Sequence, residues 1–223
     1  TLSGNLSSLS KQQSSSVYVA DATISSDNEN QNGLVRTKFD GSYTFTIDSV
    51  HEKIIKFGGN GTSSMQVFNL PASMLNDSLS YTGVSFSFSN IPDTSSVVIN
   101  VTGGNVDFHN GWRFWWTDMN NQTSELSGSY TDNAYAKRAQ QIMWNFADAS
   151  NVIIRGGQGS GTTTRNVENS AAEGNDGVWD GSFPMKTNDD PAAGMLGSIL
   201  VPNGSFESHV STNGRGWVGG SFA

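Results

Sequence analysis

Short apolar stretches that alternate with polar residues are the feature of this sequence that most restricts its fold. In "VSFSFS" (residues 84–89), Val84, Phe86 and Phe88 alternate with serine, and "SVVINVTGG" (96–104) is a β-branched run that ends in glycine. An alternation of period two buries one face of a β-sheet. Five Asn-Gly pairs favour tight turns between such runs. The sequence therefore predicts an all-β protein of many short strands.

Four pieces of the chain share one format, in which about four apolar or β-branched residues precede a Gly or Asn corner. They are "NVTGGNV", "NVIIRGG", "GSILVPNG" and "GWVGG". This format favours the rungs of a right-handed β-solenoid, in which each rung covers the core of its neighbour. In "GSILVPNG" we expect Ile199 and Val201 to point one way and Leu200 the other. A β-sandwich fits the same alternation and remains the alternative fold.

A helix and a leader complete the expected organisation. Tyr135, Ala139, Ile142 and Phe146 recur at helical spacing after Asp132, a suitable N-cap, which predicts one flanking α-helix at about residues 132–144. Residues 1–16 are rich in serine and are interpreted as a leader or edge segment. The remainder, residues 17–223, is expected to form a single β-rich domain, a length that one all-β domain can reach.

Composition excludes several classes of function. The net charge of −8 argues against binding to nucleic acid, whose phosphates favour basic surfaces. No apolar run reaches the ~18 residues of a membrane span, so we expect no membrane insertion. The absence of cysteine excludes thiol chemistry, disulfides and thiolate-bound metals. Only 14% of the residues are charged, and a polar, weakly charged surface is common among extracellular bacterial proteins.

Three stretches together resemble the choice-of-anchor A domain family of bacterial surface proteins. They are "VVINVTGGNVDF", "YAKRAQQIMWNFADASNVIIRGG", and "GMLGSILVPNGSF" with "GRGWVGGSFA". The last turn also resembles one in bacterial ice-binding β-helices. The resemblance implies an extracellular adhesin module on the bacterial cell surface or cell wall, within a larger surface protein. It carries no catalytic residues. The segments 105–130 and 160–190 depart from the family pattern, so we expect the residues that bind a ligand to lie there.

The segment "GWRFWWTD" (111–118) is the first candidate for binding. In a strand, Trp112, Phe114 and Trp116 share one face, and Arg113 and Trp115 share the other. One aromatic face suits the core, and a second leaves a ring partly exposed beside Arg113. Exposed Trp and Arg can stack on a sugar or hold a peptide, so we expect Trp112, Arg113, Trp115 and Trp116 to bind the ligand. Packing of the whole segment in the core is the alternative.

An acidic loop around a tryptophan is the second candidate. In "NDGVWDG", Asp176 and Asp180 bracket Trp179, so a sugar could stack on the indole while the carboxylates bind its hydroxyls. A calcium ion is an alternative ligand of these carboxylates, although the sequence calls for no cofactor. A solvated loop with one anchoring Trp is the structural alternative.

These observations predict non-covalent adhesion to a host or matrix glycan or protein. We expect no enzyme activity, because the chain has no Gly-x-Ser-x-Gly elbow and its three histidines stand in no recognisable catalytic motif. Three alternatives remain open: an ice-binding β-helix, a polysaccharide-degrading β-helix enzyme, and a passive spacer in a surface stalk.

Overall fold

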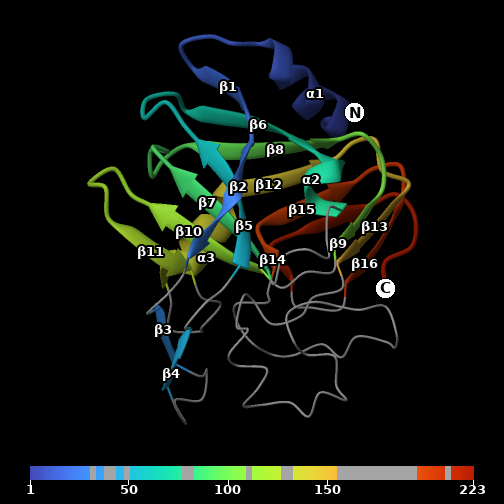
Figure 1. The fold of residues 1–223 in the computed structure, drawn as a ribbon. Coiled ribbons are helices and arrows are strands. Elements are labelled where there is room, and N and C mark those ends of the chain that lie inside the picture. Colours follow the sequence, from blue (N-terminus) through green and yellow to red (C-terminus); the bar gives the residue numbers. More distant parts are fainter. Residues whose placement is uncertain are drawn as a thin grey trace, which may run out of the picture.

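The protein is described by a computed structural model over most of its length. The described residues are 1–30, 34–37, 44–47, 51–76, 83–108, 112–126, 133–154, 195–208 and 212–223. Strands predominate among them, and the strands are gathered into sheets whose pairing is mostly parallel (Figure 1). The prediction of a β-rich fold is therefore confirmed, although the described part has more helices than the single one expected.

Two larger sheets form the body of the fold. A six-stranded parallel sheet contains, in spatial order, β1 (Val17–Asp21), β6 (Met65–Pro71), β8 (Ser96–Thr102), β12 (Ile142–Phe146), β15 (Ser198–Val201) and β18 (Gly216–Val218). A five-stranded sheet contains β11 (Thr123–Leu126), β10 (Trp112–Thr117), β7 (Gly83–Ser89), β5 (His51–Gly58) and β2 (Thr23–Asn30). In the second sheet β5, β7 and β10 run parallel, and the outer strands β2 and β11 pair antiparallel.

Smaller sheets and three helices complete the described fold. A three-stranded parallel sheet contains β16 (Ser205–Ser208), β13 (Asn151–Ile154) and β9 (Val106–Phe108). The two-stranded sheets are β14 (Met195–Leu196) with β17 (Thr212–Asn213), and β3 (Leu34–Thr37) with β4 (Thr44–Ile47). The helices are α1 (Leu2–Ser8), continued by the 3-10 turn η1 (Leu9–Lys11), α2 (Ala72–Asn76) and α3 (Asn133–Gln141). None of the helices in the described ranges is both long and apolar enough to cross a bilayer.

The core lies between the sheets and is filled by alternate residues of their strands. Phe86 stacks on Phe114 at 5.1 Å between ring centroids, and Phe57 stacks on Phe88 at 4.8 Å. Trp144 of the six-stranded sheet meets Phe86 edge to face at 5.4 Å. Full burial of such side chains contributes about 1.5–3 kcal/mol each, so this aromatic layer holds the two larger sheets together.

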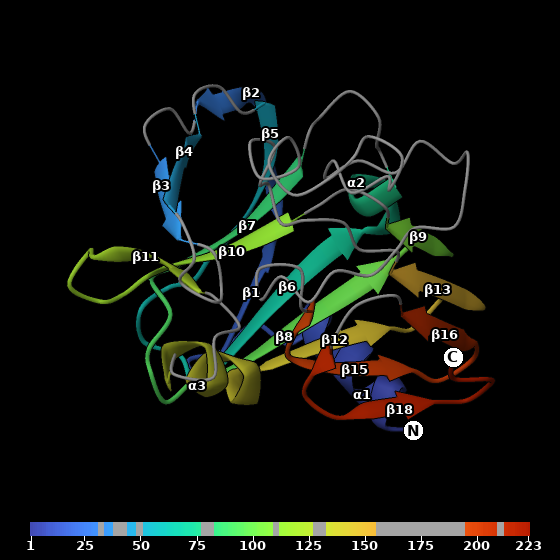
Figure 2. The same ribbon diagram turned by 90° about the horizontal axis from the view of Figure 1, so that it is seen from below.

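The expected alternation in "GSILVPNG" is present in β15. Ile199 and Val201 belong to the main core cluster, whereas Leu200, although buried, does not. β15 pairs in parallel with β12 on one side and with β18 on the other, so each strand stacks on the next along the sheet. Figure 2 shows this stacking from below.

The predicted helix is shorter than expected. We expected it at about residues 132–144, but α3 ends at Gln141 and Ile142 begins β12. The helical spacing of Ile142 coincides with a strand alternation of Ile142, Trp144 and Phe146, all buried. Parallel pairing of β12 with both β8 and β15 satisfies its backbone as a strand. Trp144 also donates its Nε1–H to the Leu196 carbonyl at 2.7 Å, which anchors the strand.

The serine-rich N-terminal residues form an ordered part of the described fold. α1 and η1 lie on the outer face of the six-stranded sheet, above a row of asparagines on neighbouring strands (Asn69, Asn100 and Asn145; Figure 1). Ser3 Oγ donates to Asn145 Oδ1 at 2.7 Å, and Ser10 Oγ donates to Asn69 Oδ1 at 2.7 Å. The contact between α1 and the sheet is therefore largely polar.

Candidate functional site

An exposed polar surface lies on the outward side of the five-stranded sheet, and we call it the hydroxyl face. Its central members, Lys56, Ser87 and Trp115, each stand between two core residues, so strand alternation directs them outward. The other members share their rows through strand pairing. Its members are half-buried or exposed, and they come from β2, β5, β7, β10 and β11. The hydroxyl face comprises Thr23, Lys56, Ser87, Ser89, Trp115, Thr117 and Thr123.

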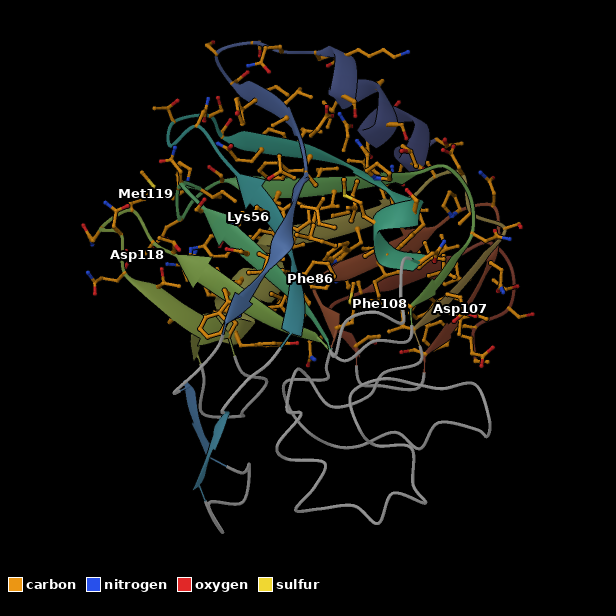
Figure 3. All side chains as sticks on the ribbon, in the orientation of Figure 1. Lys56, Phe86, Asp107, Phe108, Asp118 and Met119 are labelled. Atoms are coloured by element: carbon orange, nitrogen blue, oxygen red, sulfur yellow. The ribbon has the colours of Figure 1, made fainter. Side chains whose placement is uncertain are left out.

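The strand register aligns these side chains in two rows. In the first row Thr23 pairs with Lys56, Lys56 with Ser87, and Ser87 with Trp115. Adjacent strands lie about 4.8 Å apart, so this row extends over on the order of 14 Å. It presents one indole, one ammonium and two hydroxyls side by side. Figure 3 labels Lys56 on this sheet.

The second row is made of hydroxyl groups. Ser89 pairs with Thr117, and Thr117 pairs with Thr123 across the antiparallel edge. The Oγ1 atoms of Thr117 and Thr123 are 2.7 Å apart, so one hydroxyl donates to the other and fixes both rotamers. This row lies two residues along the strands from the first row, at a distance of about 6.6 Å.

The exposed part of the surface has a defined boundary at each end. Ile54 precedes Lys56 by two residues, yet its side chain is only 3% exposed, so the open surface begins at the row of Lys56. At the other end, the turn after β10 is fixed by Asp118, whose Oδ1 accepts the backbone N–H groups of Asn120 and Gln122 at 2.9 Å each. Met119 is exposed on this turn (Figure 3).

The structure separates the residues predicted from "GWRFWWTD". Trp115 is half-buried on the hydroxyl face, as the alternation predicted. Trp116 is 2% exposed and packs on Phe88 at 5.4 Å, so a ligand at the surface does not reach it. Trp112 and Arg113 occupy the first two positions of β10, opposite Val84 and Ser85 of β7. The prediction that Trp116 binds the ligand is therefore wrong, because the alternation of β10 turns its side chain into the core.

The second predicted group cannot be located. Asp176, Trp179 and Asp180 lie outside the described residues. The hydroxyl face is therefore defined from the described residues alone.

A buried cation holds Trp116 beneath this surface. The Arg138 guanidinium of α3 lies 4.0 Å from the centroid of the Trp116 ring and is 7% exposed. Its Nη2 is 2.9 Å from Asp93 Oδ1, and its Nη1 donates to Gln141 Oε1 at 2.7 Å. The burial of Arg138 is thus compensated by an ion pair, a hydrogen bond and an aromatic face. These contacts fix the position of β10 relative to α3.

Two pKa values are shifted in this region. Hydrogen bonds from the Lys137 ammonium and from the Arg138 guanidinium lower the pKa of Asp93 below its ordinary value. Burial raises the pKa of Tyr135, whose hydroxyl accepts a hydrogen bond from Asn213 Nδ2 at 3.0 Å. Asp93 is therefore charged and Tyr135 neutral at physiological pH, and both act in packing and charge compensation.

The chemistry of the hydroxyl face suits binding. Hydroxyls both donate and accept, an ammonium donates, and an indole offers an apolar plane. A pyranose ring matches this set, because its C–H face packs on an indole while its hydroxyls bond to Ser, Thr and Lys. In the described part of the chain, no three His, Asp or Glu side chains gather closely enough to hold a metal ion.

Most of the hydroxyl face was not predicted from the sequence. Ser87 and Ser89 had a signal, because they alternate with buried Phe86 and Phe88 in "VSFSFS". Lys56 and Thr23 had none, since they reach the row of Trp115 only through the pairing of β2, β5, β7 and β10. Strand order in a parallel sheet depends on long-range pairing, which no local pattern encodes.

Comparison with known proteins gives one match. The family model described as "Putative Ice-binding-like adhesive domain" matches residues 1–164, which include the hydroxyl face and α1. The search of curated proteins and the search of solved structures returned no match. The match supports an adhesin-like domain, the coarser part of the resemblance seen in the sequence, and it is not specific to choice-of-anchor A. It covers well over half of the chain, which therefore belongs to the family of ice-binding-like adhesive domains.

Proposed function

We propose that this protein is an adhesin module that binds a host or matrix glycan or protein non-covalently through the hydroxyl face. The observation that carries the proposal is the row of Thr23, Lys56, Ser87 and Trp115, aligned by register on an outward sheet surface. Membership of an adhesive family supports the same function. Of the two ligand classes, a glycan fits the row better, because indole stacking and many hydroxyl partners are what a pyranose needs.

We further propose a right-handed β-solenoid as the architecture behind this surface. Support comes from strands far apart in sequence that stack in parallel and in register, as in β5–β7–β10 and β6–β8–β12–β15–β18. Handedness follows from the strong preference of parallel strand crossovers for the right-handed form. In such a fold each row of the hydroxyl face crosses successive rungs, because each rung contributes one strand to the sheet.

The cellular setting is part of the proposal. We infer an extracellular location on the bacterial cell surface or cell wall, within a larger surface protein of the choice-of-anchor A type. We propose that the module acts without enzyme activity and without a cofactor. Support comes from the adhesive family and from the low content of charged residues. The same proposal includes a single domain after residue 16. It also includes a contribution to the ligand surface from Asp176, Trp179 and Asp180.

Ice is the second candidate ligand. It is favoured by the second row, in which Ser89, Thr117 and Thr123 present hydroxyls on consecutive strands, and by the ice-binding-like family. Lys56 and Trp115 interrupt the regular hydroxyl pattern in the first row, which favours a glycan over ice. Thermal hysteresis separates the two candidates, because a glycan adhesin shows none.

A glycan array followed by titration with the free glycan tests the proposal. We expect Trp115→Ala to weaken binding about 30-fold, equivalent to about 2 kcal/mol, because it removes the stacking surface of an interface hot spot. Met119→Ala removes an exposed apolar side chain outside the hydroxyl face and is the matched control. The proposal fails if the wild-type chain binds neither glycans nor matrix proteins, or if Trp115→Ala and Met119→Ala bind equally well.

A further inference from the structure

The two outer edges of the six-stranded sheet, β1 and β18, differ in whether their outward backbone groups are hydrogen-bonded. At β1, the side chain of Gln13 accepts the backbone N–H of Val19 at 2.7 Å, and the Ser14 N–H donates to the Val17 carbonyl at 2.8 Å. These contacts occupy the edge that would otherwise receive another strand. Natural proteins commonly cover sheet edges in this way, which prevents uncontrolled pairing with other chains.

The β18 edge has no such cover from any element that the structure describes. Trp217 is 41% exposed and Phe222 is 62% exposed, two of the few large apolar side chains at the described surface. The glycines around them, Gly216 and Gly219, are exposed as well. An open strand edge beside exposed aromatic rings is a surface suited to another β-strand.

The backbone of β18 presents its free groups in a defined pattern. The Arg215 carbonyl accepts the Ile199 N–H at 2.8 Å, and the Gly219 N–H donates to the Val201 carbonyl at 2.9 Å. Backbone groups of alternate residues in a strand point to opposite sides. The N–H and C=O groups of Gly216 and Val218 therefore point away from β15, toward the open edge.

We propose that this edge binds a second copy of the chain, with the two β18 strands antiparallel about a two-fold axis at Trp217. Gly216 then lies opposite Val218 of the second copy, and each such pair exchanges two hydrogen bonds. The two Trp217 residues form the non-hydrogen-bonded pair between them, with Cα atoms about 4.5 Å apart. Their side chains lie on the same face, where cross-strand aromatic pairs are favourable.

The distribution of charge favours this arrangement over others. Each chain carries a net charge of −8, which opposes self-association, but Gly216–Val218 contains no charged residue. The antiparallel register places Arg215 opposite Gly219 of the second copy, so no like charges face each other. Pairing of β18 with a second copy's β1 is blocked by Gln13. The pairing is therefore symmetric and closed, and it stops at a dimer.

Sedimentation equilibrium of the 223-residue chain tests the proposal. The wild-type chain is expected at twice its 23.8 kDa mass. Trp217→Glu places two carboxylates opposite each other and should give a monomer, whereas the matched control Met119→Glu, at another exposed apolar position, should remain a dimer. A monomeric wild-type chain at every concentration, an open-ended series of oligomers, or a dimeric Trp217→Glu variant overturns the proposal.

A disulfide trap tests the register. The chain contains no cysteine, so Trp217→Cys introduces a single thiol. Cα atoms of a non-hydrogen-bonded pair lie within the range that a disulfide spans, so mild oxidation should link the two copies. Met119→Cys gives the background rate of random linkage. Equal rates of linkage for the two variants would contradict the two-fold axis at Trp217, and neither readout depends on the ligand of the hydroxyl face.

Discussion

At the scale of single residues, Asn145 connects the N-terminal helix to the sheet. Its side chain is fully buried, accepts from Ser3 Oγ, and donates to Asn100 Oδ1 at 2.8 Å and to Ser7 Oγ at 3.2 Å. A buried polar network is stable only while each member keeps its partners. The asparagine row is therefore specific for α1, because it supplies the donors and acceptors that the helix side chains require.

Asn145→Ala is expected to lower the free energy of unfolding by roughly 2 kcal/mol. The substitution leaves Ser3 Oγ and Asn100 Oδ1 without partners, and an unsatisfied buried group costs about 1–3 kcal/mol. Urea unfolding followed by tryptophan fluorescence measures the change. Asn120→Ala, at an exposed turn position, is the control and should leave the midpoint unchanged. Equal midpoints for the two variants would show that the network contributes nothing.

Because of Asp93, we expect the stability of the folded state to vary with pH in the acid range. Its pKa is lowered in the folded protein by hydrogen bonds from Lys137 and Arg138, so the folded state favours the charged carboxylate. The resulting stability is fully present above the ordinary pKa of 3.8 and is lost as the pH falls through the lower folded-state value. Wild type should exceed Asp93→Asn in urea midpoint at neutral pH, and the difference should shrink below about pH 4. A difference that is constant with pH would disprove the linkage.

At the scale of elements, the segment from α3 to β15 depends on close backbone contact. Gly197 precedes β15 with a φ of 106°, and a Cβ atom there would lie 2.8 Å from the Ile142 carbonyl oxygen, at the start of β12. Only a residue without a side chain allows the two strands to begin at the same level. The glycine at this position therefore sets where β15 begins.

Gly197→Ala should destabilise the protein more than Gly103→Ala. Both glycines have positive φ, so both variants carry backbone strain of about 1 kcal/mol, but a Cβ at Gly103 meets nothing within 4 Å. The clash at Gly197 adds about 1–3 kcal/mol of overpacking. Thermal unfolding of the two variants measures the difference, and similar midpoints would mean that the strands adjust without cost.

The elements also show what the sequence could predict. The alternation of Phe86 and Phe88 with serine correctly placed β7 and its buried face, because a strand buries alternate residues whatever its neighbours are. The predicted end of α3 was wrong, because the position of Ile142 fits a helix and a strand equally well. Only the pairing of β12 with β8 and β15 decides for a strand. The helix α1 was missed, since Ser, Gly and Asn favour helix weakly and its stability comes from the sheet beneath it.

For the candidate site, the sequence identified the strand but not the surface. Alternation separated Trp115 from Trp116, and burial then assigned Trp116 to the core. Which neighbours Trp115 has depends on the order β11–β10–β7–β5–β2, which brings together residues from 23 to 123. A local pattern contains no information about that order. The contribution of Lys56 could thus be found only in the structure.

At the scale of the whole molecule, the N-terminal residues act at two places on the six-stranded sheet. α1 covers the asparagine row on the outer face, and Gln13 occupies the β1 edge. Residues 1–16 thus cover the asparagine row with polar side chains and also occupy the β1 edge of the same sheet. Without the Gln13 contact, the β1 edge could pair with β18 of another copy. Association could then continue beyond a dimer.

A chain that begins at residue 17 is therefore expected to be less stable and to associate further. The loss of the contacts from Ser3, Ser10 and Gln13 should lower the urea midpoint clearly, since each hydrogen bond contributes about 1 kcal/mol. Size-exclusion chromatography should show species larger than the wild type. Gln13→Ala frees the Val19 N–H at the β1 edge but leaves α1 and the contacts of Ser14 in place. It should therefore increase association and lower the midpoint less than the truncation does. A truncated chain with the wild-type midpoint and elution volume would make residues 1–16 a dispensable leader.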